Sequence, residues 1–186
     1  MRMGVEMTNF LTLYHGTTHD FNKIDVQKGK PFKDFGQGFY LSKIFEHAHN
    51  LAFRNRRIEE MRLKAMGRET QLPVYVYEYK FDMANLEKLE VKRFTSPDRD
   101  WLKFIIANRM NYARQHNYDI VIGPTANDET RTSIRTVMNA ANGAILSDTA
   151  LDLLIEMLEP NVLPEQYYFG TSKSAAMLKF GGRRKI

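Results

Sequence analysis

Short apolar segments alternate with polar, glycine-containing segments at the start of the chain. Residues 10–14 are apolar or β-favouring, which predicts a strand that ends at His15. The polar segment 28–38 predicts a loop that leads into a second strand at 39–41. Ser42 can then cap the helix that follows.

A long helix and an aromatic strand are predicted next. Apolar residues recur at steps of three, four or seven through 44–66, as on one helix face, and Gly67 can end the helix. Residues 73–81 alternate as in a strand. One side of that strand is aromatic and predicts a core face, formed by Tyr75, Tyr77, Tyr79 and Phe81.

The second half of the chain predicts further helices and strands. Ser96, Pro97 and Asp98 favour a helix start, and the helix is expected to reach His116. By spacing, Asn108 shares its apolar stripe, so a buried amide there would need a defined partner. The stripe comprises Trp101, Phe104, Ile105, Asn108 and Tyr112. The remaining expectations are a strand at 118–123, a loop at 127–130, helices at 131–141 and 148–158, a strand at 166–169 and a short helix capped by Ser172.

Length and composition predict one soluble, cytoplasmic domain over residues 1–186, with a basic tail at 183–186. The 186 residues suffice for one core, and the chain has no cysteine, which excludes disulfides, thiol nucleophiles and cysteine-ligated zinc. No apolar run approaches the roughly 20 residues of a membrane span, so no membrane partner is expected. His47 and His49 would lie on different helix faces, and no metal site is expected.

Basic residues are clustered in the sequence. The formal charge is +5, and many of the cations fall in 54–68 and 183–185. Such clusters can attract the phosphates of a nucleic acid or a dinucleotide. The alternative is a solvated helix face and a frayed tail.

The chemistry-bearing residues lie in three short segments. Beside His15, Gly16 lets a flat ligand approach the backbone and Thr17 adds a hydroxyl. Behind Gly36 and Gly38, the ring of Tyr40 could support a planar ligand, with Ser42 nearby. The third segment begins at Glu165 and Gln166.

These segments resemble the three motifs of the diphtheria-toxin and poly(ADP-ribose)-polymerase branch of ADP-ribosyltransferases. The matching stretches are Tyr14-His15-Gly16-Thr17, Gly36-Gln37-Gly38-Phe39-Tyr40 and Gln166-Tyr167. The chain is most similar to an uncharacterised bacterial branch that is often encoded in toxin–antitoxin or phage-defence loci. The resemblance implies an α+β fold in which two small crossed β-sheets form an NAD cleft with flanking helices.

The resemblance also implies roles for individual residues. His15 would bind ribose hydroxyls, Gly16 the nicotinamide carboxamide, and Tyr40 would stack on nicotinamide. The catalytic set is therefore His15, Tyr40 and Gln166. The expected cofactor-binding set is His15, Gly16, Thr17, Gly38, Tyr40, Ser42 and Arg54, and the candidate target-binding set is Arg57, Asn108 and Arg109.

The third motif departs from the family pattern, because Gln166 stands where the catalytic glutamate begins its strand. Glutamine can bond a hydroxyl but cannot accept a proton at pH 7, which disfavours polymer elongation. Glu165 is adjacent, but neighbouring strand residues face opposite sides.

The expected function is transfer of one ADP-ribose from NAD, the co-substrate, to a macromolecule. RNA or DNA is preferred over protein, and a cognate antitoxin is an expected partner. Three alternatives are open: an inactive NAD or ADP-ribose binding module, a nucleic-acid binding module, and an NAD glycohydrolase.

Overall fold

The computed structural model describes residues 9–126, 128–140, 146–157 and 164–186. They form an α+β protein, so that part of the fold prediction is confirmed. The chain divides into two compact units. The first unit comprises Met1–Ile24, Tyr40–Leu89 and Ser172–Ile186, and the second comprises Asp25–Phe39 and Glu90–Thr171. The expected crossing of two sheets stays a prediction.

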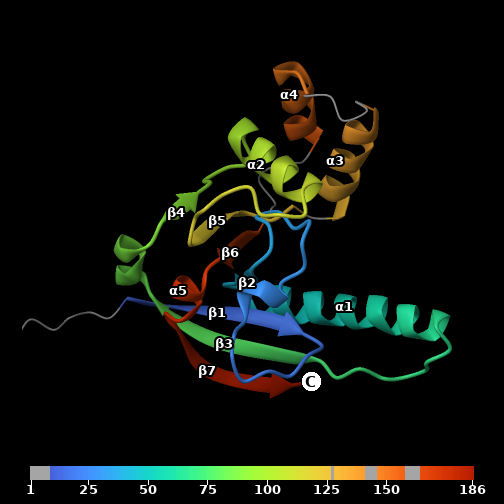
Figure 1. The fold of residues 1–186 in the computed structure, drawn as a ribbon, viewed down its shortest axis with the longest axis vertical. Coiled ribbons are helices and arrows are strands. Elements are labelled where there is room, and N and C mark those ends of the chain that lie inside the picture. Colours follow the sequence, from blue (N-terminus) through green and yellow to red (C-terminus); the bar gives the residue numbers. More distant parts are fainter. Residues whose placement is uncertain (1–8, 127, 141–145, 158–163) are drawn as a thin grey trace, which may run out of the picture. The chain divides into compact units, whose positions relative to one another are not determined.

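The first unit is an antiparallel sheet with one long helix. Its strand order is β2-β1-β3-β7, and β1 pairs with β3 along its whole length, from Phe10↔Asp82 to Thr17↔Tyr75. Helix α1 runs alongside β1 and β3 (Figure 1). The bounds are β1 Phe10–Thr17, β2 Phe39–Ser42, α1 Phe45–Ala65, β3 Tyr75–Asp82, the 3₁₀ helix η2 Met83–Lys88, α5 Ser172–Ala175 and β7 Leu178–Lys185.

The aromatic row predicted on β3 is buried, as expected. Tyr77 and Phe81 are each only 1% exposed. Val76, on the opposite side of the strand, is also buried, because α1 covers that face of the sheet. Both faces of β3 therefore contribute to the core of the first unit.

The described residues of the second unit form three strands, three α-helices and one 3₁₀ helix. Its strand order is β4-β5-β6, with β4 parallel and β6 antiparallel to β5. β5 is buried along its whole length. The bounds are the 3₁₀ helix η1 Val26–Lys28, β4 Val91–Arg93, α2 Arg99–Met110, β5 Ile120–Pro124, α3 Asp128–Ala140, α4 Asp148–Met157 and β6 Glu165–Phe169.

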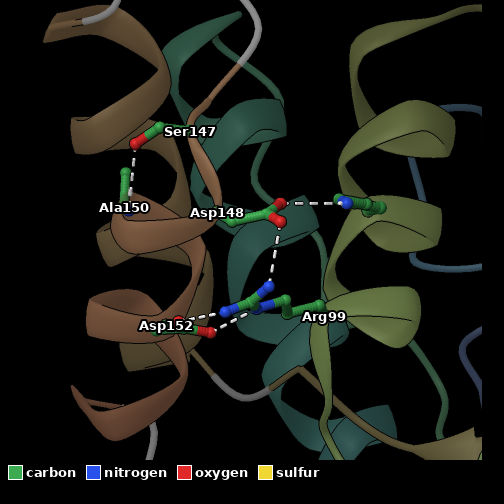
Figure 2. Close-up of polar contacts among 6 residues, drawn as sticks. Arg99, Ser147, Asp148, Ala150 and Asp152 are labelled. Atoms are coloured by element: carbon green, nitrogen blue, oxygen red, sulfur yellow. Dashed lines mark hydrogen bonds and ion pairs between the residues drawn. The ribbon is translucent and has the colours of Figure 1, made fainter.

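Ion pairs join α2 to α4. Figure 2 shows the Arg99 guanidinium between two carboxylates of α4, with Nε donating to Asp152 over 2.5 Å and Nη1 donating to Asp148 over 2.9 Å. Lys103, one turn further along α2, also contacts Asp148 at 3.3 Å. Since Arg99 is 43% exposed, salt should weaken this connection.

Several predicted boundaries of the second unit were wrong. Asp98, rather than Ser96, caps α2, because its carboxylate accepts the backbone N–H of Trp101 over 2.9 Å. The helix ends at Met110, well before His116, and Tyr112 is 70% exposed instead of lying on the apolar stripe.

Other predicted boundaries also moved. Strand β1 continues to Thr17, so His15 lies within a strand and not at its end. Residues 183–185 are not a tail, because they form the end of β7 and pair with β3. α3 begins at Asp128 within the predicted loop, and Asn127 lies outside the described residues.

Candidate functional site

His15 and Tyr40, from two different motifs, are joined by a hydrogen bond in the first unit. Nδ1 of His15 on β1 lies 2.8 Å from the backbone carbonyl of Tyr40 on β2. Because a carbonyl can only accept, Nδ1 must carry a proton. Burial lowers the pKa of His15 to about 4, although this hydrogen bond opposes the shift. The ring is therefore neutral at pH 7, and Nε2 is in its acceptor form.

Aromatic side chains hold the segment that follows β1 against the His15 side of the sheet. The Phe21 ring meets His15 edge-on at 5.9 Å and stacks on Tyr77 at 4.3 Å. Tyr77 is the direct β3 partner of His15. Its hydroxyl donates to Asp20 over 2.7 Å and accepts the Phe21 N–H over 2.8 Å. The surroundings of His15 are thus fixed by contacts within the first unit.

Gly16 is required by packing, which the sequence reasoning did not anticipate. A Cβ built there would lie 1.8 Å from the backbone oxygen of Ala48 and 3.1 Å from the Ala52 side chain, both in α1. The absent side chain therefore lets α1 approach β1 closely. Access of a flat ligand is not needed to explain this glycine.

The hydroxyls of Thr17 and Ser42 each accept one local hydrogen bond. Thr17 accepts from the backbone N–H of His19, and Ser42 accepts from that of Ile44, each over 3.1 Å. Ile44 is the N-cap residue of α1 and makes no side-chain cap hydrogen bond, so the prediction that Ser42 caps this helix was wrong. The Ser42 hydroxyl binds the backbone just before the helix instead. Each hydroxyl proton can still be donated to a ligand.

Gly36 and Gly38 are explained by contacts inside the second unit. Gly36 has a φ of +82°, which favours glycine. A Cβ at Gly38 would lie 2.2 Å from the ring of Tyr168 and 2.9 Å from the Phe169 carbonyl. Packing is sufficient to explain both glycines, and the expectation that they make room for a ligand on Tyr40 stays a prediction.

Gln166 is hydrogen-bonded to a buried carboxylate. Its Nε2 donates to Oδ2 of Asp34 over 3.0 Å and more weakly to the Pro124 carbonyl over 3.4 Å. On the other side of β6, Glu165 accepts a 2.7 Å hydrogen bond from the Tyr167 hydroxyl. The two residues therefore point to opposite sides, as the strand pattern predicted.

The candidate target-binding residues Asn108 and Arg109 have structural partners. Asn108 is 1% exposed, donates to the Phe104 carbonyl over 2.9 Å and accepts from the Gln115 backbone over 3.0 Å. Arg109 donates Nε to Asp34 over 2.8 Å and also pairs with it through Nη2. These contacts place both residues in a structural network, and target binding by them stays a prediction.

The candidate residues thus fall into two groups. His15, Gly16, Thr17, Tyr40, Ser42, Arg54 and Arg57 belong to the first unit, and Gly38, Asn108, Arg109 and Gln166 belong to the second. Arg54 and Arg57 are exposed on α1. Most of the loop at 159–165, which the family resemblance associates with target selection, lies outside the described residues.

Sequence reasoning missed Asp34. It lies in a polar loop between Lys33 and Phe35, where an aspartate is normally solvated, yet it is only 6% exposed. Its hydrogen-bond partners come from sequence positions 75 or more residues away. The only local signal was the pair of flanking aromatic residues, Phe32 and Phe35.

Metal-ligating and membrane-spanning features were also sought in the described part of the chain. It contains no cluster of three or more histidine, aspartate or glutamate side chains that could hold a metal ion. None of its helices is both long and apolar enough to cross a membrane.

Comparison with known proteins gave one match. A family model described as "Protein of unknown function (DUF3990)" covers residues 11–180, which is most of the chain. No curated protein and no solved structure matched.

Proposed function

The chain belongs to the DUF3990 family, and we propose from its own residues that it is an NAD-dependent mono-ADP-ribosyltransferase. The proposal includes the expected biological setting, a cytoplasmic toxin or phage-defence effector with a cognate antitoxin. It rests on the motif resemblance together with the chemistry of the residues in the first unit.

The hydrogen bond between His15 and Tyr40 is the observation that carries the proposal. It joins the imidazole of His15, from the first motif, to the backbone carbonyl of Tyr40, from the second motif. The neutral ring presents Nε2 as an acceptor, which suits a ribose hydroxyl and not an anionic phosphate. Thr17 and Ser42 supply hydroxyl donors suited to a carboxamide oxygen or a ribose oxygen.

NAD would supply the glycosidic bond between ribose and nicotinamide. That bond breaks, nicotinamide leaves with the bonding electrons, and a nucleophile of the acceptor attacks the ribose carbon and loses a proton. In the proposal, His15 orients the ribose and Tyr40 supports the nicotinamide ring. Catalysis would come from holding the reacting groups in place and from stabilising the positive charge that develops on the ribose, so no covalent intermediate with the enzyme is needed.

Nucleic acid is the proposed acceptor, on the basis of cations on α1. Arg54 and Arg57 are exposed there. Arg56 and Arg62 pair with glutamates of the same helix, at 2.9 and 3.4 Å, so α1 carries less uncompensated positive charge than its arginine count suggests. Exposed arginines can contact phosphates, and such binding weakens as salt is added.

A second candidate function is NAD or ADP-ribose binding without turnover. Gln166 lacks an ionisable group, and its amide nitrogen is already hydrogen-bonded to Asp34 and Pro124. A site with this residue can hold a hydroxyl but cannot remove its proton.

The test measures nicotinamide release and transfer of labelled ADP-ribose, with and without purified RNA, DNA and protein acceptors. We expect transfer to a macromolecule and a loss of at least about 100-fold in His15→Ala and Tyr40→Ala. His19→Ala and Tyr112→Ala, which remove exposed rings, serve as controls. NAD binding without turnover would favour the binding module, and turnover without an acceptor would favour a glycohydrolase.

A further inference from the structure

We propose that Asp34 is a positioning residue that fixes the Gln166 amide with its nitrogen inward, so that Gln166 acts only as an acceptor toward a hydroxyl of the ligand. The inference deepens the proposed function and rests on it for the identity of the ligand.

The Asp34 carboxylate is itself held firmly inside the second unit. Oδ1 accepts from Arg109, and Oδ2 accepts the backbone N–H of Ala126 over 3.1 Å. The Asp34 and Arg109 side chains are only 8% and 14% exposed. A carboxylate fixed by a guanidinium and a backbone amide forms a rigid base for a third hydrogen bond.

That third hydrogen bond determines which way the Gln166 amide faces. The two groups near its nitrogen are Oδ2 of Asp34 and the Pro124 carbonyl oxygen, both of which are acceptors. A reversed amide would set its own oxygen against both of them and lose both hydrogen bonds. Only the orientation with Nε2 inward is therefore compatible with Asp34.

The amide oxygen is the end that remains for a ligand. Among the described residues, Oε1 of Gln166 has no hydrogen-bond partner, and no buried side-chain oxygen lacks one. Oε1 must therefore contact solvent. Since both amide protons are directed at Asp34 and Pro124, Gln166 presents an acceptor and no donor, which suits a ribose hydroxyl.

This geometry explains why glutamine occupies the position in this chain. A carboxylate in place of the Gln166 amide would lie about 3 Å from that of Asp34, and two such groups cannot both be ionised without a large cost. The arrangement should accept a carboxylate at this position only when the side chain at position 34 can donate a hydrogen bond to it.

The test is a double-mutant cycle of Gln166→Glu, Asp34→Asn and the combined variant in the full chain. Melting temperatures and NAD turnover are measured for all four proteins. Gln166→Glu should melt at least about 5 °C lower and lose at least about 10-fold in turnover. Asp34→Asn should also lower both, because Arg109 loses its carboxylate and the amide is no longer fixed.

The combined variant decides the matter. Its new side-chain amide at position 34 can donate to its new carboxylate at position 166, which then presents an outward acceptor. In this variant the Ala126 N–H faces an amide nitrogen in place of Oδ2, so we expect partial recovery. The combined variant should melt above Gln166→Glu and above the value to which the two single losses add, with turnover at least about 3-fold higher than that of Gln166→Glu. Additive effects on melting would overturn the inference. Recovered melting without recovered turnover would show that Asp34 acts on stability alone and would overturn its positioning role.

The two proposals fail in different ways. If the wild-type protein neither binds nor turns over NAD, the proposed function is refuted. The melting cycle then decides alone whether Asp34 fixes the amide, because it requires no ligand.

Discussion

Replacing Gly16 by alanine tests whether this glycine serves helix packing or ligand access. The added Cβ would lie 1.8 Å from the Ala48 oxygen, whereas ordinary contact begins at 3.4 Å. Helix α1 and strand β1 would have to separate by about 1.6 Å, and the contacted atom belongs to the helix backbone, which cannot rotate away.

The magnitude follows from the cost of overpacking. Inserted methyl groups typically cost about 1 to 3 kcal/mol, and a backbone clash belongs at the upper end. For a chain of this size, about 3 kcal/mol corresponds to a melting temperature lowered by about 6 to 12 °C. Thermal unfolding followed by far-UV circular dichroism measures this shift directly.

Gly182→Ala is the matched control. It lies in β7 of the same unit, has no positive φ, and a Cβ there meets nothing within 4 Å. We expect a change within about 0.5 kcal/mol. If Gly16→Ala melts like this control, α1 does not pack on β1 as described. If it melts normally but no longer binds NAD, the glycine serves the ligand instead.

Three further outcomes can be measured. Burial lowers the pKa of both His15 and His116 to about 4, so between about pH 6.5 and 4 the unfolded chain binds protons that the folded chain does not. The free energy of unfolding should therefore fall as the pH drops through this range. His116→Gln should make that fall less steep, as measured by urea titrations at each pH. Asp98→Ala should lower the free energy of unfolding by about 1 kcal/mol, because α2 loses its cap. Ser96→Ala, at an exposed position, should leave the free energy of unfolding unchanged in the same titrations. Equal losses in the two variants would contradict the assignment of Asp98 as the cap. Arg99→Ala should lower the melting temperature at low salt, and the difference from wild type should shrink in 1 M salt, at a Debye length of about 3 Å; a difference that does not depend on salt would contradict an ionic role.

Most of the regular elements could be predicted because their patterns are local. The apolar spacing of 44–66 gave α1 to within a residue at each end, and the aromatic row of β3 is buried as expected. Strand β7 was missed because Leu178–Lys185 carries four charged residues and two glycines, and only pairing with β3 makes it a strand.

The candidate site was less predictable, because its interactions join distant parts of the sequence. The sequence identified His15 and Tyr40 separately, but not the hydrogen bond that joins them across 25 positions. Asp34 had only nearby aromatic residues as a local signal, since its burial depends on the distant Arg109 and Gln166. The reasons for Gly16 and Gly38 were also not predictable, because the atoms that exclude a side chain there belong to α1 and β6.

The position of Trp101 gives the protein a built-in optical reporter of one unit. It is the sole tryptophan of the chain, lies fully buried on α2, and donates its indole N–H to the Pro124 carbonyl over 3.0 Å. Emission excited where tyrosine does not absorb therefore comes from the second unit alone. A tryptophan melting curve that departs from the backbone curve would show that the two units unfold as separate cooperative blocks.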